Sequence, residues 1–109
     1  MINIEDFGKV EIKIGKIISA EKLEGSEKLL KLSVDFGEES PRQVVSGIAK
    51  AYPEPEILVG REASFVTNLE PRKIMGLESQ AMIMAASNSD ELPVILTPEK
   101  EVPPGSSIR

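Results

Sequence analysis

The sequence contains no cysteine and no histidine. Without cysteine there is no thiol nucleophile and no disulfide framework, and without either residue type the usual structural zinc sites are excluded. The lack of histidine also removes the side chain most often used for acid–base catalysis near neutral pH. These absences count against an enzyme, and we expect neither a metal nor another cofactor.

Aromatic residues and long apolar runs are also scarce. Only 4% of the residues are aromatic while 40% are hydrophobic, so the core must be built from aliphatic side chains. No apolar run reaches the roughly 20 residues that a bilayer span requires, and no secretory signal pattern is present. We expect a cytoplasmic protein without a membrane partner, folded as a single domain over residues 1–109.

Basic residues are outnumbered by acidic ones, 13 to 18, which gives a net charge of −5. This balance alone disfavours nucleic acid, because phosphate binding requires Lys and Arg. However, six lysines fall between positions 9 and 31, and further basic residues follow at Arg42, Arg72 and Lys73. A local basic face on an acidic molecule is one interpretation. The alternative is an ordinary solvated outer face of Lys-rich strands.

The first half of the chain predicts a short helix and three strands. Asn3 can cap a helical turn within residues 3–10. Apolar residues alternate over 10–18, where Gly15 breaks the phase and indicates a bulge or sharp bend. Alternation over 29–36, a turn, and a strand over 42–49 together predict a hairpin.

The second half predicts a short helix over 51–60, a strand over 61–69, a loop over 70–79 and an apolar strand over 80–86 that is covered on both faces. Three strands, a short helix and two strands form the element order of a five-stranded oligonucleotide-binding (OB) barrel. We therefore predict an all-β fold of this class. The tail, 92–109, includes a short strand over 93–97 for which such a barrel has no internal partner, so we expect it to form a homodimer contact.

Candidate nucleophiles have no suitable base. Ser46 and Ser79 lack a histidine, and a Ser–Lys pair using Lys31 or Lys73 has no recognisable spacing. No Gly-rich phosphate loop is present. The pattern is that of a binding protein and not of an enzyme.

In an OB barrel the ligand lies on the outer face of strands two and three, between the loops after strands one and four. Those loops are 21–28 and 68–79, and Lys31, Arg42 and Ser46 lie between them. No run of aromatic residues accompanies them, so base stacking is not expected. Contacts to phosphate and ribose of a folded RNA fit this surface better.

Four blocks in this order resemble the tRNA-binding domain family: 26–32 (SEKLLKL), 42–48 (RQVVSGI), 68–76 (NLEPRKIMG) and 78–82 (ESQAM). The likeness extends from Ile4 to Gly105 and is closest to the C-terminal domain of methionyl-tRNA synthetase. It implies a non-catalytic, often homodimeric OB module that raises the tRNA affinity of the synthetase catalytic domain or subunit. Two alternatives within the same fold are a free-standing dimeric tRNA-binding protein and an export-related chaperone that binds unfolded protein.

The resemblance also assigns candidate RNA-binding positions. They are Lys28, Lys31, Arg42, Ser46, Asn68, Arg72, Lys73, Ser79 and Met82. Structural roles compete at three of them: Asn68 can cap a loop, Met82 can belong to the core, and Ser46 can satisfy backbone groups in a bulge.

Overall fold

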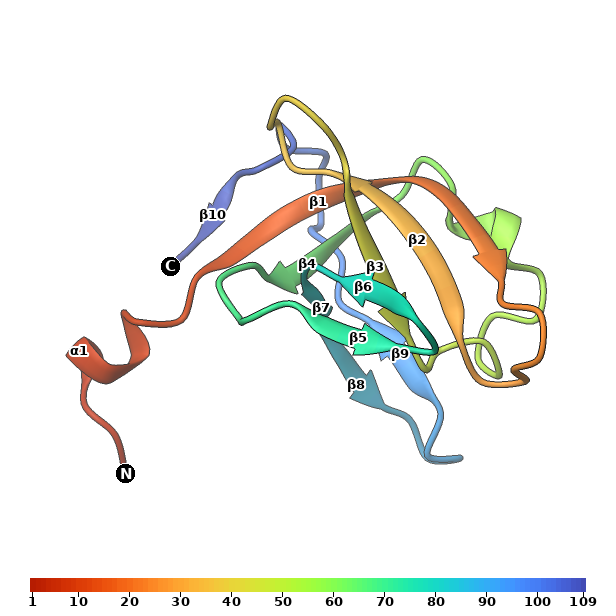
Figure 1. The fold of residues 1–109 in the computed structure, drawn as a ribbon. Helices are drawn as coiled ribbons and strands as arrows, with labels where there is room; N and C mark the ends of the chain where they lie inside the picture. Colours follow the sequence, from red (N-terminus) through yellow and green to blue (C-terminus); the bar gives the residue numbers. More distant parts are fainter.

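A computed structural model describes all residues, 1–109, and shows a mostly β molecule built around one sheet (Figure 1). The strands of this sheet lie in the order β3-β2-β1-β4-β7, and β10 pairs with the start of β1. The sheet curls into a nearly closed barrel of five strands, which confirms the predicted fold class. No helix is long and apolar enough to cross a bilayer.

Strand β1 (Ile12–Lys22) is the long bent strand that holds the barrel together. Its first half pairs with β4 (Glu62–Val66) and its second half with β2 (Leu30–Asp35). The prediction for Gly15 was a bulge or a sharp bend, and the bulge is not found there, since the register shifts later, between Ile17 and Ser19. Gly15 is required for space instead, because a Cβ there would overlap the side chains of Val34 and Phe36.

The core lies inside the barrel and follows the predicted alternation. Leu30, Leu32, Val34 and Phe36 are all buried, and the Phe36 ring meets Phe65 edge-on with centroids 5.2 Å apart. Strand β3 (Arg42–Ser46) continues the hairpin from β2. The helix expected between the third and fourth strands is a short 3₁₀ helix, η1 (Pro55–Leu58), which buries Leu58 against the core.

The segment 70–86 differs from the prediction. Residues expected to form a loop make a second hairpin, β5 (Arg72–Ile74) and β6 (Leu77–Ser79), whose two turn residues, Met75 and Gly76, both have positive φ. The expected strand over 80–86 is divided into β7 (Met82–Ile83) and β8 (Ala85–Ser87). It is not covered on both faces, because Met82 is 50% exposed and β8 is exposed throughout.

The tail finds partners within its own chain, contrary to the expectation that it could not. β9 (Pro93–Ile95) pairs with β8, and β10 (Ser107–Ile108) pairs with the start of β1. At the other end, α1 (Ile4–Phe7) is capped by the Asn3 side chain as predicted. However, α1 buries no residue, and Figure 1 shows it standing away from the barrel. Phe7 is therefore exposed and does not anchor the helix to a core.

Candidate nucleic-acid interface

The barrel is closed by side chains as well as by backbone at the seam between β3 and residues 79–81. The buried Ser79 hydroxyl accepts a hydrogen bond from Val45 N (3.0 Å) and lies near Ala81 O (3.2 Å). Gln80 N donates to Gln43 O (2.8 Å), and Gln43 N donates to Gln80 Oε1 (2.8 Å). Ser79 thus replaces part of a strand ladder and fixes the β5–β6 hairpin against β3.

This seam places a hollow of about 130 Å³ beside the hairpin. Four of the predicted RNA-binding residues line it: Ser46, Arg72, Ser79 and Met82. Six of its ten lining residues are hydrophobic, among them Leu69 and Ile74. Met82 points outward at this hollow and is not part of the core, and the Ser46 side chain makes no hydrogen bond that would satisfy a bulge. The alternatives considered for these two residues are therefore wrong.

Free positive charges lie on the segments around the hollow, and one of them, Arg72, lines it. Lys28, Arg72 and Lys73 are exposed, and none of them forms an ion pair with an acidic side chain. Lys28 belongs to the loop between β1 and β2, and the other two belong to β5. This loop approaches the hairpin turn, since a Cβ on Gly25 would lie 3.9 Å from the Met75 methyl group. The loop that contains Lys28 and the hairpin that contains Arg72 and Lys73 are thus neighbours.

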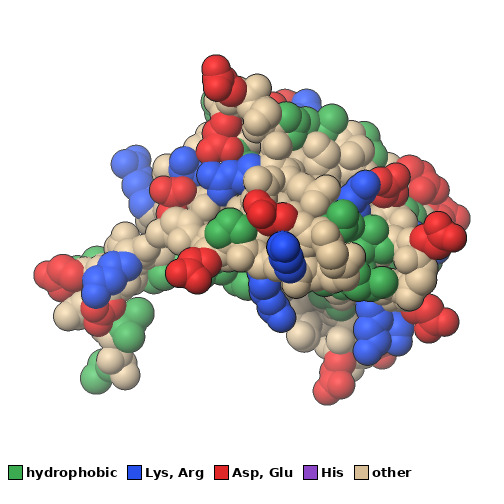
Figure 2. All heavy atoms as spheres, in the orientation of Figure 1, with side chains coloured by type: hydrophobic (Ala, Val, Ile, Leu, Met, Phe, Trp, Pro, Cys, Tyr) green, Lys and Arg blue, Asp and Glu red, His purple; other side chains and the backbone are tan.

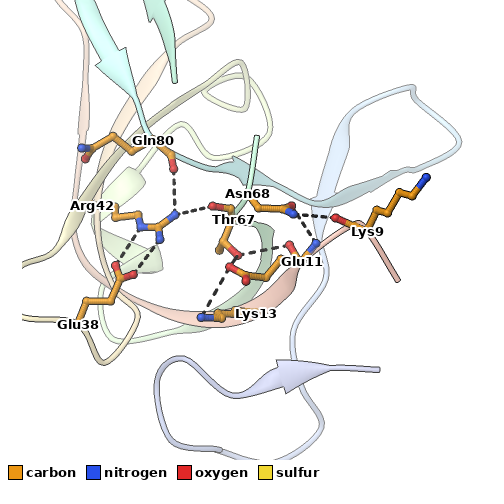
Figure 3. A network of polar contacts seen from close by, with 8 residues as sticks. All are labelled: Lys9, Glu11, Lys13, Glu38, Arg42, Thr67, Asn68 and Gln80. Carbon is orange, nitrogen blue, oxygen red and sulfur yellow. Dashed lines mark hydrogen bonds and ion pairs between the residues drawn. The ribbon is translucent and has the colours of Figure 1, made fainter. Parts of the chain in front are cut away.

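Arg42 is held by the protein itself (Figure 3). Its Nε and Nη2 donate to the two carboxylate oxygens of Glu38 at 2.9 and 2.8 Å. Its Nη1 donates to the backbone oxygens of Thr67 (2.7 Å) and Gln80 (3.2 Å), and its guanidinium carbon lies 5.4 Å from the centre of the Phe36 ring. The hydrogen bond from Arg42 lowers the pKa of the Glu38 carboxyl group. The same bond raises the pKa of the Arg42 guanidinium.

Asn68 extends the same network to the start of β1. Its side chain accepts from Glu11 N (2.9 Å) and donates to Lys9 O (2.7 Å), so it fastens the end of β4 to the segment before β1. Thr67 Oγ1 donates to Glu11 Oε1 (2.6 Å), and this bond, followed by the nearby Lys13 and Arg42 charges, lowers the pKa of Glu11. Asn68 thus has a structural role, but it joins two segments that are distant in the sequence and does not cap its own loop.

Lys31 lies on a second, polar hollow of about 380 Å³ on the outer face of β1, β2 and β3. Its Nζ is 2.8 Å from Glu21 Oε1, so its charge is paired. Sequence reasoning did not identify the neutral side chains around it as site residues. Those are Ser19, Ser33, Gln43 and Gln80. The apolar alternation over 29–36 already indicated that Ser33 faces outward. Which residues of the neighbouring strands lie beside Ser33 could be known only from the register of the sheet.

The comparisons of this chain with known proteins agree on one family. The family model for a putative tRNA binding domain matches residues 12–107. Over 109 residues the chain is 55% identical to the methionine–tRNA ligase of Methanoregula boonei, and over 108 residues it is 49% identical to that of Methanocella arvoryzae. These matches cover 99–100% of this chain but only 15–16% of the ligases.

Solved structures show the same fold. A MetRS-related protein from Pyrococcus horikoshii superposes with a TM-score of 0.91 at 38% identity, covering 100% of this chain and 98% of the other. The chaperone CsaA from Bacillus anthracis superposes with a TM-score of 0.89 at 31% identity, covering 100% and 99%. The barrel, the hairpin and the tail are thus shared along whole chains.

Proposed function

Because the chain belongs to the putative tRNA binding domain family, we propose that it binds tRNA through the surface around the β5–β6 hairpin. The observation that carries the proposal is that unpaired cations, Lys28, Arg72 and Lys73, lie on the β1–β2 loop and the β5–β6 hairpin, and that Arg72 lines the hollow that contains Ser46 and Met82. Free Lys and Arg side chains contact phosphates and release counterions, which is the sequence-independent part of RNA binding.

The remaining predicted residues have different tasks in this proposal. Arg42, Asn68 and Ser79 hold the hairpin and the strand ends in place, since their side chains are occupied by partners in the chain. Lys31 lies on the adjoining face and shares its charge with Glu21. RNA contact at the charged positions therefore falls mainly to the β1–β2 loop and the β5–β6 hairpin.

The experiment compares Lys73→Ala with Lys100→Ala, two exposed lysines outside any ion pair, of which Lys100 lies on a separate hollow with Glu99 and Glu101. For Lys73→Ala we expect weaker binding of a tRNA transcript and a slope of log K against log salt that is shallower by about 1. Arg72→Ala should behave in the same way, and Lys100→Ala should bind like the unchanged chain. Equal effects at positions 100 and 73 would mean that the face is elsewhere.

A second candidate function is binding of unfolded protein. It is favoured by the similarity to the chaperone CsaA and by the apolar floor of the hollow, which includes Leu69, Ile74 and Ile83. An apolar side chain of an extended polypeptide would fit such a floor. Binding of an unfolded polypeptide but not of tRNA, measured side by side, would favour this function over the first.

The chain spans about 15% of the length of the curated ligases that it matches. We propose that it serves a methionine–tRNA ligase in the cytoplasm as an accessory module that supplies tRNA affinity and no catalytic group. Covalent or tight attachment to a catalytic domain raises the effective concentration of tRNA near the active site. A free-standing tRNA-binding protein would use the same face.

We also propose that the module is a homodimer. The apolar side chains of Ile4, Phe7 and Val10 are exposed on the arm that precedes β1. An apolar hollow of about 480 Å³ lies near the base of this arm, between the start of β1 and the tail, and includes Leu96 and Ile108. A two-fold dimer lets each copy cover the apolar surface of the other. The tail would then contribute through its outward-facing side chains, since its strands are already paired.

A further inference from the structure

A row of neutral hydrogen-bonding side chains crosses three strands on the outer face of the barrel. Ser19 of β1 is the cross-strand partner of Ser33 of β2, and Ser33 is the partner of Gln43 of β3. With Gln80, these side chains line the polar hollow of about 380 Å³. Neighbouring strands are about 4.8 Å apart, so the row is about 10 Å long.

The row has unused donors and acceptors that point to a ligand with both. The hydroxyls of Ser19 and Ser33 bind no group of the chain. Gln43 Nε2 donates to Glu78 O (2.9 Å), which leaves Gln43 Oε1 as a free acceptor. Gln80 Oε1 accepts from Gln43 N (2.8 Å), which leaves the Gln80 amide N–H groups as free donors.

The charges around this row are already neutralised. Lys31 is paired with Glu21 at 2.8 Å, and Arg42 is paired with Glu38 at 2.8 Å. Figure 2 shows an uncharged area over the middle of β1 and β2, with acidic and basic side chains around it. A phosphate placed here would meet no unpaired cation, whereas a neutral hydroxyl would find partners for both its proton and its lone pairs.

We propose that the row Ser19–Ser33–Gln43 binds ribose 2′-hydroxyl groups and gives the module a preference for RNA over DNA. The inference rests on the proposed tRNA binding and adds a second contact area to it. A-form RNA stems have a wide, shallow minor groove that displays the 2′-hydroxyls, and a shallow neutral surface can lie against it. The free cations Lys28 and Lys73 then contact phosphate, while the row contacts sugar.

The test uses three probes at fixed salt: a tRNA transcript, DNA of the same sequence, and the fully 2′-O-methylated RNA. The chain should bind the transcript more tightly than either analogue. The double variant Ser19→Ala/Ser33→Ala should lose affinity for the transcript on the order of tenfold, as expected when two hydrogen bonds are removed. Its affinity for DNA and its salt slope should stay unchanged, because no phosphate contact is lost.

Two further variants control for structure. Ser33→Thr keeps a hydroxyl and suits a strand, so it should retain most of the preference for RNA. Ser87→Ala/Ser89→Ala removes two exposed hydroxyls around β8, far along the chain from the row, and should change nothing. Equal losses for RNA and DNA in the Ser19/Ser33 variant, or equal binding of transcript and methylated RNA by the unchanged chain, would overturn the inference. Absence of any tRNA binding by the unchanged chain would instead overturn the proposed function.

Discussion

Arg42 was expected on the RNA face, and its guanidinium is bound by groups of its own chain although its side chain also lines the polar hollow of β1, β2 and β3. Its guanidinium joins the turn after β2, the end of β4 and the segment before β7. Only the fork-shaped guanidinium can serve a carboxylate and two carbonyls at once, and a lysine would reach one or two of them. The sequence shows that a cation occupies position 42. It does not show that the hydrogen bonds of this cation hold three segments of the barrel together.

The prediction for Arg42→Ala is therefore a loss of stability. The carbonyls of Thr67 and Gln80 would lose their side-chain donor, and the free energy of unfolding should fall by about 1–3 kcal/mol. Arg42→Lys should recover only part of this. Urea unfolding monitored by circular dichroism would measure both, with Lys73→Ala as a control that leaves the midpoint unchanged. If Arg42→Ala had normal stability but bound tRNA weakly, Arg42 would be an RNA-contacting residue and not a structural one.

Gly15 shows where single residues limit sequence reasoning. The alternation of apolar residues does break at this position, but a bulge is not the cause. The cause is that Val34 and Phe36 pack against the backbone of Gly15 and leave no room for a side chain. These neighbours come from β2 and the turn after it, so local sequence around Gly15 contains no sign of them.

Whole elements were predicted best where periodicity is strong. The alternation over Leu30–Phe36 and the Pro-opened turn at Pro55 located β2 and η1. The β5–β6 hairpin was missed because its strands have three residues each, and its turn, Met75-Gly76, lacks the Asn-Gly or Asp-Gly signal. The apolar run 80–86 suggested a strand buried on both faces. Because this segment lies at the seam of the barrel, the Met82 side chain is exposed on the outer face.

The proposed homodimer can be tested at the apolar hollow between the start of β1 and the tail. Leu96 is exposed and lines the apolar hollow, so Leu96→Asp should leave the fold intact and place a charge inside the proposed dimer contact. Sedimentation at micromolar concentration should show a dimer for the unchanged chain and a monomer for this variant. Leu69→Asp, also exposed but in the hollow beside Met82, is the matched control and should remain a dimer. A monomeric unchanged chain would exclude the dimer.

At the scale of the whole molecule, the net charge of −5 repels tRNA at long range. Binding must therefore depend on short-range contacts at one face, and a single copy should bind modestly. Two copies in a dimer present two such faces, and attachment to a catalytic domain makes tRNA capture local. An accessory role in a larger enzyme fits these properties better than capture of dilute tRNA by a single free chain.

The last prediction concerns that role. Interactions made by this module do not touch the reacting atoms, so they stabilise bound tRNA equally in the ground state and the transition state. Such uniform binding lowers KM and does not raise kcat. Removing residues 1–109 from a methionine–tRNA ligase that contains them should therefore raise KM for tRNA by a factor corresponding to about 1–3 kcal/mol.

In that experiment kcat should stay nearly constant, and methionine activation, measured without tRNA, should be unaffected. The ligase carrying Leu96→Asp separates the two contributions, because it keeps each RNA face and loses only the dimer. Its KM should lie between those of the intact and the truncated enzyme if avidity contributes. A large fall in kcat, or a loss of methionine activation after truncation, would mean that the module shapes the catalytic site, and binding alone would no longer describe what it does.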